Sequence, residues 1–251
     1  MQVIATGAHL GGGWLALGLV LAAYLIIGQP LVGSWSQQRL RRTRADPRSL
    51  LRRYRRTAAL EWALVAVSAV LVAGAPGLTA ADVGLRWPRL AGGAAPYTVA
   101  GAVGLAGSLA LLAGLRYRID RGAEVVAPAE VLALIPRTTA ERRAFASVSI
   151  TAGVCEEVLY RGLLLAVAVA VWPDIPAVRL VLLSGIAFGL AHAYQGVPGM
   201  LTTAVLGASL AVLYVGSGSL LLPVLYHVLV DLRVLVLAVG RRRPRHGYLP
   251  S

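Results

Sequence analysis

The stretch Val154-Cys155-Glu156-Glu157-Val158-Leu159-Tyr160-Arg161 places two adjacent carboxylates and an arginine inside a long apolar segment. This segment, residues 145–171, is long enough to cross a lipid bilayer as a helix. A charged side chain at the centre of a spanning helix costs about 2.5–3.5 kcal/mol on insertion scales. Three such charges so close together therefore indicate a functional site within the membrane.

The whole chain has the composition of an integral membrane protein. Of its 251 residues, 57% are hydrophobic, and the mean hydropathy is +0.71, whereas soluble domains hold roughly 45–50% apolar residues. We predict an all-α, polytopic membrane helical bundle in the cell membrane, with about seven transmembrane helices. The expected spans are residues 11–32, 58–78, 97–115, 145–171, 178–194, 200–215 and 220–239.

The positive charge is concentrated between the apolar segments. The net charge is +13, and all 24 basic residues are arginines, 19 of which fall within residues 39–56, 116–143 and 241–245. Such alternation follows the positive-inside rule and predicts an outer N-terminus and a cytoplasmic C-terminus. It favours contact with anionic lipids and argues against nucleic acid. We expect residues 39–56 to form a cytoplasmic loop with a short amphipathic helix on the membrane, and arginine without lysine indicates a bacterial, GC-rich genome.

The chain is predicted to have three parts. Residues 1–130 hold N-terminal transmembrane helices and basic loops, residues 131–240 hold a catalytic core, and residues 241–251 form a basic cytoplasmic tail. Glu61 opens the second span, and we interpret it as an interfacial residue with a structural role. Cys155 is the single cysteine, which excludes an intramolecular disulfide, and we interpret it as a small packing residue.

Helical geometry separates the charges of the fourth span. Glu157 and Arg161 are four residues apart and share a helix face, so we expect them to pair. Glu156 lies about 100° further round the helix and faces a different partner. The pair is therefore expected to orient neighbouring groups, and Glu156 to react.

Two histidines lie in other predicted spans beside polar or aromatic groups. His192 follows Phe188 by four residues, and Asp231 follows His227 by four residues. A carboxylate one helical turn from an imidazole can set its tautomer and raise its basicity. Each feature alone is compatible with a structural role, but together they favour one site in a low-dielectric bundle.

Two imidazoles and several carboxylates in such a bundle support hydrolysis of a carbonyl compound, most naturally a peptide bond. They can hold Zn²⁺, which activates water. Without a metal, a glutamate and a histidine can act together as the general base on water. Both schemes remain open at this point.

The order Glu156-Glu157-x-x-x-Arg161, Phe188-x-x-x-His192 and His227-x-x-x-Asp231 resembles the three-motif signature of the CPBP family. That family includes type II CAAX prenyl endopeptidases and bacteriocin-processing or self-immunity proteins, and the resemblance covers residues 132–236. It implies an intramembrane metalloendopeptidase with its active site among the last four helices. The implied substrate is a membrane-embedded or prenylated peptide or protein.

The resemblance also implies a role for each motif residue. Glu156 and His192 would activate water, and Glu156, His192 and His227 would hold a zinc ion. His227 and Asp231 would support the oxyanion or the metal, with the remaining pair, Glu157 and Arg161, behind them. Asp231 stands where the eukaryotic CAAX enzymes typically have asparagine. An ionised Asp231 would repel an oxyanion, so it must be protonated, pair with His227 or bind metal.

Two other functions are compatible with a helical bundle that buries charge. One is a non-catalytic immunity or scaffold protein of the same fold. The other is an ion-coupled transporter, which would be expected to show inverted repeats and broken helices; the sequence has no internal repeat. Ala193 follows His192, so the His-Glu-x-x-His motif of other membrane metalloproteases is absent.

Overall fold

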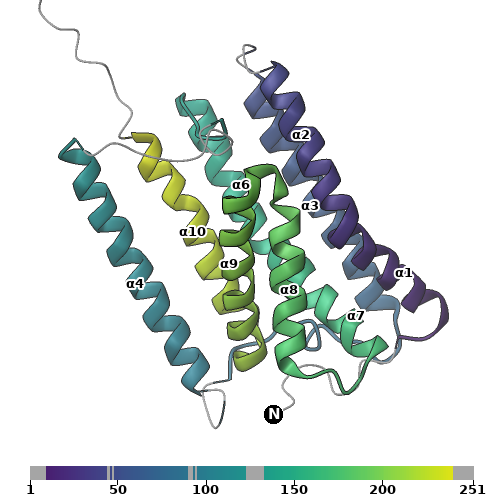
Figure 1. Cartoon of the computed structure of the whole chain (residues 1–251). Helices are drawn as coiled ribbons and strands as arrows, with labels where there is room; N and C mark the ends of the chain where they lie inside the picture. The colour runs from purple at the N-terminus through teal and green to yellow at the C-terminus, as the bar shows by residue number, and fades with distance from the viewer. Residues whose placement is uncertain are drawn as a thin grey trace, which may run out of the picture.

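The computed structural model describes residues 10–43, 46, 48–89, 93, 95–122 and 133–239. All regular elements in these residues are helices (Figure 1), which confirms the all-α fold class. They are α1 (Gly12–Ala23), η1 (Tyr24–Gly28), α2 (Gln29–Thr43), α3 (Ser49–Gly74), α4 (Ala95–Asp120), α6 (Thr139–Glu157), η3 (Val158–Leu163), α7 (Leu164–Val171), α8 (Ala177–Ala191), η4 (Ala193–Gln195), α9 (Gly196–Ser217) and α10 (Leu221–Val239). The predicted basic tail, 241–251, lies outside the described residues.

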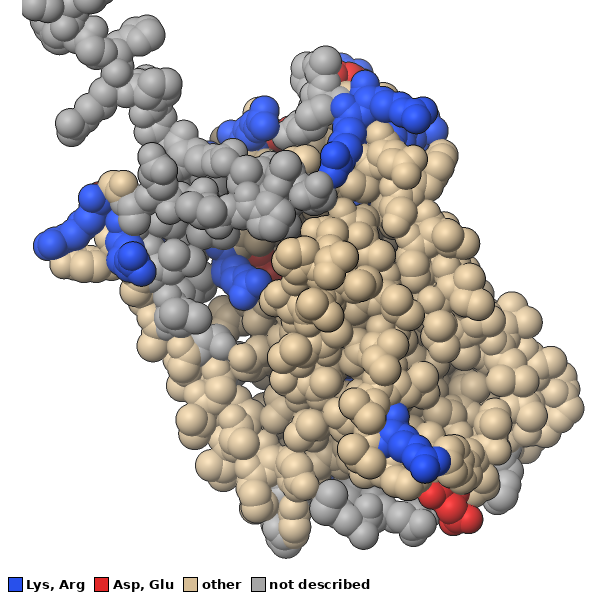
Figure 2. Space-filling model, viewed as in Figure 1, with Lys and Arg blue, Asp and Glu red and all other residues tan. Residues whose placement is uncertain are grey.

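Three helices within the described ranges are long and apolar enough to cross a membrane. They are Gly12–Thr43, formed by α1, η1 and α2; α3; and Ala193–Ser217, formed by η4 and α9. Helix α8 is apolar but shorter, with 15 residues. A broad belt without charged groups separates the two ends of the visible face (Figure 2). The chain is therefore a multi-pass membrane protein.

The arginine-rich segment 39–56 extends two long helices, so the prediction of a separate helix on the membrane surface is wrong. Helix α2 continues to Thr43 and α3 begins at Ser49. Asp46 joins them, since it accepts a hydrogen bond from the Arg48 N–H at 2.8 Å and pairs with the Arg52 side chain. Helix α4 ends and α6 begins at the same end of the bundle (Figure 1), where Figure 2 shows most of the basic side chains.

The helix that carries the predicted fourth span begins at Thr139, before the apolar segment, and is interrupted. A capping box starts α6: the Glu141 N–H donates to Thr138 Oγ1 at 3.1 Å, and the Thr138 N–H donates to Glu141 Oε2 at 3.1 Å. The π-helical segment η3 then separates α6 from α7 and contains Arg161. π-helical turns are rare in proteins overall, and those that occur often lie at functional sites. This one lies in the stretch that carries the charges.

Close contact between α6 and α10 depends on Gly153. A Cβ atom at this position would overlap Val228 Cγ2 and would lie 2.9 Å from the Val228 backbone nitrogen. Small residues allow helices in lipid to approach in this way. Helix α10 carries His227, so this contact sets the distance between His227 and the carboxylates of α6.

Gly153→Ala is therefore expected to lower both thermal stability and any activity of the site. Overpacking of this kind costs about 1–3 kcal/mol, which is measured as a lower Tm of the purified protein. Gly107→Ala in α4 is the matched control, because a Cβ there meets no atom within 4 Å. Equal Tm values for the two variants would show that α6 and α10 are not tightly packed at Gly153.

Candidate active site

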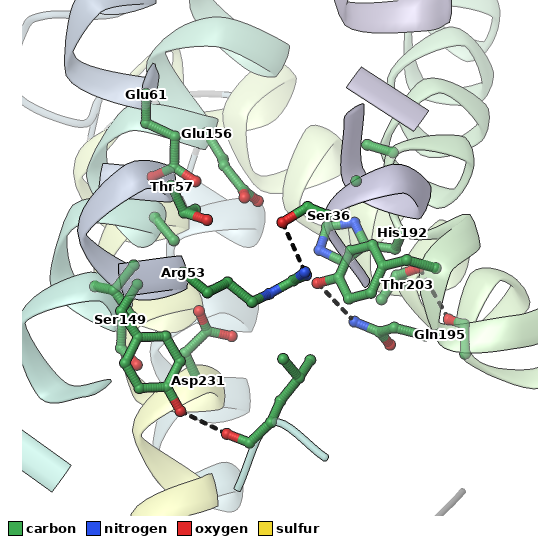
Figure 3. Close-up of a pocket in the computed structure, with 18 of the residues that line it drawn as sticks. Ser36, Arg53, Thr57, Glu61, Ser149, Glu156, His192, Gln195, Thr203 and Asp231 are labelled. Atoms are coloured by element: carbon green, nitrogen blue, oxygen red, sulfur yellow. Dashed lines mark hydrogen bonds between the residues drawn. The ribbon is translucent and has the colours of Figure 1, made fainter. Parts of the chain in front are cut away.

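A cavity of about 650 Å³ lies between α2, α3, α6, α9, α10 and the end of α8. Four of the six site residues predicted from the sequence line it: Glu156, His192, His227 and Asp231. Figure 3 shows the labelled members of this set on different walls of the cavity. The other two, Glu157 and Arg161, are 0% exposed and contact the lining residues from behind.

Glu157 and Arg161 form the buried ion pair that their spacing predicts. Arg161 Nη1 donates to Glu157 Oε1 at 2.8 Å, and Nη2 donates to the carbonyl of Gly207 at 3.0 Å. The guanidinium carbon also lies 4.4 Å from the centroid of the Phe188 ring, a cation–π distance. The arginine thus links η3 to α8 and α9, and the glutamate charge is compensated without water.

Glu157 in turn orients His227. Its Oε1 lies 2.7 Å from His227 Nδ1, which therefore carries a proton and donates it. His227 Nε2 faces two other carboxylates, at 3.8 Å from Glu156 Oε2 and 3.9 Å from Asp231 Oδ2. These distances exceed a direct hydrogen bond, so neither carboxylate is bonded directly to Nε2.

His192 terminates α8 and is held by its own helix. Its Nδ1 lies 2.8 Å from the carbonyl of Phe188 and donates to it, which leaves Nε2 as a lone-pair nitrogen. The Phe188 ring packs against both imidazoles, with centroid separations of 4.6 Å to His192 and 5.5 Å to His227. One aromatic ring therefore fixes both histidines and the arginine behind them.

Glu61 is a cavity residue that the sequence analysis missed. It is 1% exposed, and its carboxyl group lies close to that of Glu156. Figure 3 shows both on one wall of the cavity, next to Thr57. The available signal was an acidic residue after the last arginine of the segment, Arg56, with only apolar residues and two hydroxyls around it.

The described side chains do not form a ready zinc site. No group of three or more His, Cys, Asp or Glu among them is arranged to hold a metal ion. Tetrahedral Zn²⁺ bound at about 2.0–2.2 Å separates its nitrogen and oxygen ligands by about 3.3–3.6 Å. His227 Nε2 and Glu156 Oε2, 3.8 Å apart, approach this separation, but His192, the third expected ligand, does not complete the set.

Comparison with known proteins places the three motifs in one family. Residues 140–233 match the family model described as Type II CAAX prenyl endopeptidase Rce1-like. The match runs from the first turn of α6 into α10 and contains every motif residue named above. A search of curated proteins found no match, and neither did a search of solved structures. Over residues 140–233 the chain is thus similar to the Rce1-like family, and its predicted resemblance to the CPBP family is confirmed.

Proposed function

We propose that the protein is an intramembrane endopeptidase that hydrolyses a peptide bond of a membrane-associated substrate in this cavity. The observation that carries the proposal is the arrangement of His227 between Glu157 and Glu156. Its Nδ1 is held at 2.7 Å by the buried Glu157, and its Nε2 faces the Glu156 carboxylate across 3.8 Å. The Rce1-like match supports the same reaction class.

Water bound between Glu156 and the histidines is the nucleophile of this scheme. Glu156 takes one proton from the water as the water oxygen attacks the carbonyl carbon. His192 Nε2 orients the water by accepting a hydrogen bond from its other hydrogen. A His227 protonated on both nitrogens, its charge balanced by Glu157, donates from Nε2 to the oxyanion. Glu156 then passes its proton to the amide nitrogen, the C–N bond breaks, and a carboxylic acid and an amine leave.

Asp231 is proposed to act on His227 and not on the oxyanion. It lies 3.9 Å from His227 Nε2, and its side chain is 34% exposed. A carboxylate in this place attracts the protonated imidazole and holds its ring in position. Asp231, which stands where the eukaryotic enzymes typically have asparagine, thus fits a role in pairing with His227 better than a role as hydrogen-bond donor to the oxyanion.

The membrane placement that accompanies this function has seven crossings. The arginine-rich ends of α2, α3, α4 and α6 lie on the cytoplasmic side, against anionic lipids, with the N-terminus outside and the C-terminus inside a bacterial cell membrane. The cavity reaches Arg39 and Thr43 at this end. A membrane-embedded or prenylated peptide would therefore enter from the cytoplasmic boundary.

The test is cleavage of a panel of quenched peptides by the purified protein in lipid nanodiscs. The wild type is expected to cleave, and His192→Ala is expected to lose about 10²–10⁴-fold in kcat/KM. Absence of cleavage of every peptide and of a total membrane-protein extract would contradict the proposal and favour a scaffold.

Zinc is a second candidate for the same site, but Glu156, His192 and His227 would have to move closer together to hold it, because the described side chains are not arranged as a zinc site. The bound ion would act as a Lewis acid on water and on the carbonyl oxygen. The cleavage assay is repeated with a chelator, and the purified protein is analysed for metal. Activity that is lost with the chelator and restored by Zn²⁺ would establish the metalloenzyme. Chelator-resistant activity without stoichiometric metal would establish the scheme above.

A further inference from the structure

Arg53 of α3 projects into the cavity without an acidic partner among the described residues. Its Nη1 donates to Ser36 Oγ at 2.8 Å, and its guanidinium carbon lies 5.3 Å from the centroid of the Tyr194 ring. Both neighbours are neutral. Figure 3 shows the guanidinium in the middle of the cavity, between the wall that carries Glu156 and the one that carries His192 and Gln195.

This arrangement differs from that of the other arginines with a defined role. Arg52, the preceding residue, pairs with Asp46, and Arg161 pairs with Glu157. Arg53 is half-buried, so part of the water that would solvate its charge is replaced by protein. A cation in that position is stabilised by an anion, and the planar guanidinium binds carboxylates through two parallel hydrogen bonds.

We propose that Arg53 binds a carboxylate group carried by the peptide substrate and so positions the scissile bond; this rests on the endopeptidase function proposed above. The other N–H groups of Arg53 have no protein acceptor in the described part of the chain and are available to the ligand. Ser36 and Tyr194 hold the guanidinium from α2 and η4, and keep it in place before substrate arrives. A cavity of about 650 Å³ is within the usual size range of small-ligand pockets, about 300–1,000 Å³, so the carboxylate and the scissile bond lie in one compartment.

The test uses matched peptides that differ only in one carboxylate. One pair has a free or an amidated C-terminus, and the other has an internal Glu or Gln near the cleavage point. Wild type is expected to prefer one acidic member by about 10–100-fold in kcat/KM, mainly through KM, as a charge-assisted hydrogen bond would give. Arg53→Gln should remove this preference and leave the neutral peptide unaffected. Arg53→Lys should keep part of it.

Arg55→Gln is the matched control, because Arg55 lies on the same helix and carries the same charge but does not line the cavity. It should retain the full preference. The same peptides are also titrated against Glu156→Gln by fluorescence anisotropy, so that binding is read without turnover. Absence of cleavage with an Arg53-dependent preference in binding would overturn the proposed function and keep the carboxylate site.

Three results would overturn the carboxylate site itself. Arg53→Gln could weaken all peptides equally, which would indicate a structural role. It could leave the preference intact, which would place the carboxylate elsewhere. Its effect could occur only in nanodiscs with anionic lipid and vanish in zwitterionic phosphatidylcholine, which would assign the guanidinium to the headgroup of an anionic lipid.

Discussion

Replacing Arg161 by methionine is expected to destabilise the folded protein by about 3–5 kcal/mol, the usual cost of leaving one member of a buried ion pair without its partner. Methionine fills much of the same space but removes the bonds to Glu157 Oε1 and to the Gly207 carbonyl. Glu157, 0% exposed, would keep His227 as its one partner among the residues that the structure describes. Thermal unfolding in detergent, followed by tryptophan fluorescence, measures the change as a lower Tm.

The double variant Glu157→Gln/Arg161→Met separates charge from packing. It removes both charges together, so it should recover a large part of the lost stability. It should not recover activity, because a neutral glutamine no longer holds the protonated His227. If the single and double variants unfold at the same temperature, the contribution of Arg161 is packing against Phe188 and the ion-pair account is contradicted.

Replacing Glu156 by glutamine is expected to lower kcat/KM for peptide cleavage by about 10²–10⁴-fold, the contribution of a general base. Glutamine has the same shape but cannot take the proton from water. Stability should be unchanged or higher, because Glu156 Oε2 is buried without a hydrogen-bond partner among the described residues. Initial rates at saturating and subsaturating peptide, together with the Tm, measure both effects.

Cys155→Ala is the matched control for this variant. Cys155 is adjacent in sequence and fully buried, and it does not line the cavity. Its removal should leave kcat/KM within a few-fold of the wild type. A large loss in Cys155→Ala with normal activity in Glu156→Gln would reverse the roles and make the site thiol-dependent.

The C-terminal half of the site could be predicted because its chemistry follows helical spacing. Four-residue separations place Glu157 beside Arg161, and Asp231 beside His227, within a single helix. Charges within apolar segments are costly enough to indicate that these residues are used. The same arguments identify the all-α membrane class, since the apolar segments are long.

The contribution of the N-terminal helices could not be predicted in this way. Glu61 and Arg53 both belong to α3, and nothing in their spacing indicates that α3 packs against α6 beside Glu156. Tertiary packing brings Glu61 next to the carboxyl group of Glu156. Helix α2 continues beyond the predicted span and brings Ser36 to Arg53. The length of α2 was also underestimated, because a cluster of arginines interrupts hydropathy without interrupting a helix.

The predicted zinc ligands illustrate a second limit of prediction from the sequence. The sequence indicates which donors lie in the same bundle, but a metal site depends on differences in position of less than 1 Å. In the structure, Glu157 holds His227 Nδ1 and the Phe188 carbonyl holds His192 Nδ1, which leaves Nε2 of each ring as the nitrogen available to a metal. The acceptor that fixes His192 lies in its own helix, but the one that fixes His227 lies in α6, whose position relative to α10 the motifs do not specify.

The central claim is that Glu156 and the histidines direct water to a peptide bond in this cavity. Mass spectrometry of peptide products formed in H₂¹⁸O tests it most directly, with the wild type and Glu156→Gln compared in the same nanodiscs. The wild type is expected to cleave at one internal position with ¹⁸O in the new carboxylate, and Glu156→Gln to form at least about 10²-fold less of this product. Labelled product at equal rates with both proteins, or no product with either, would contradict it.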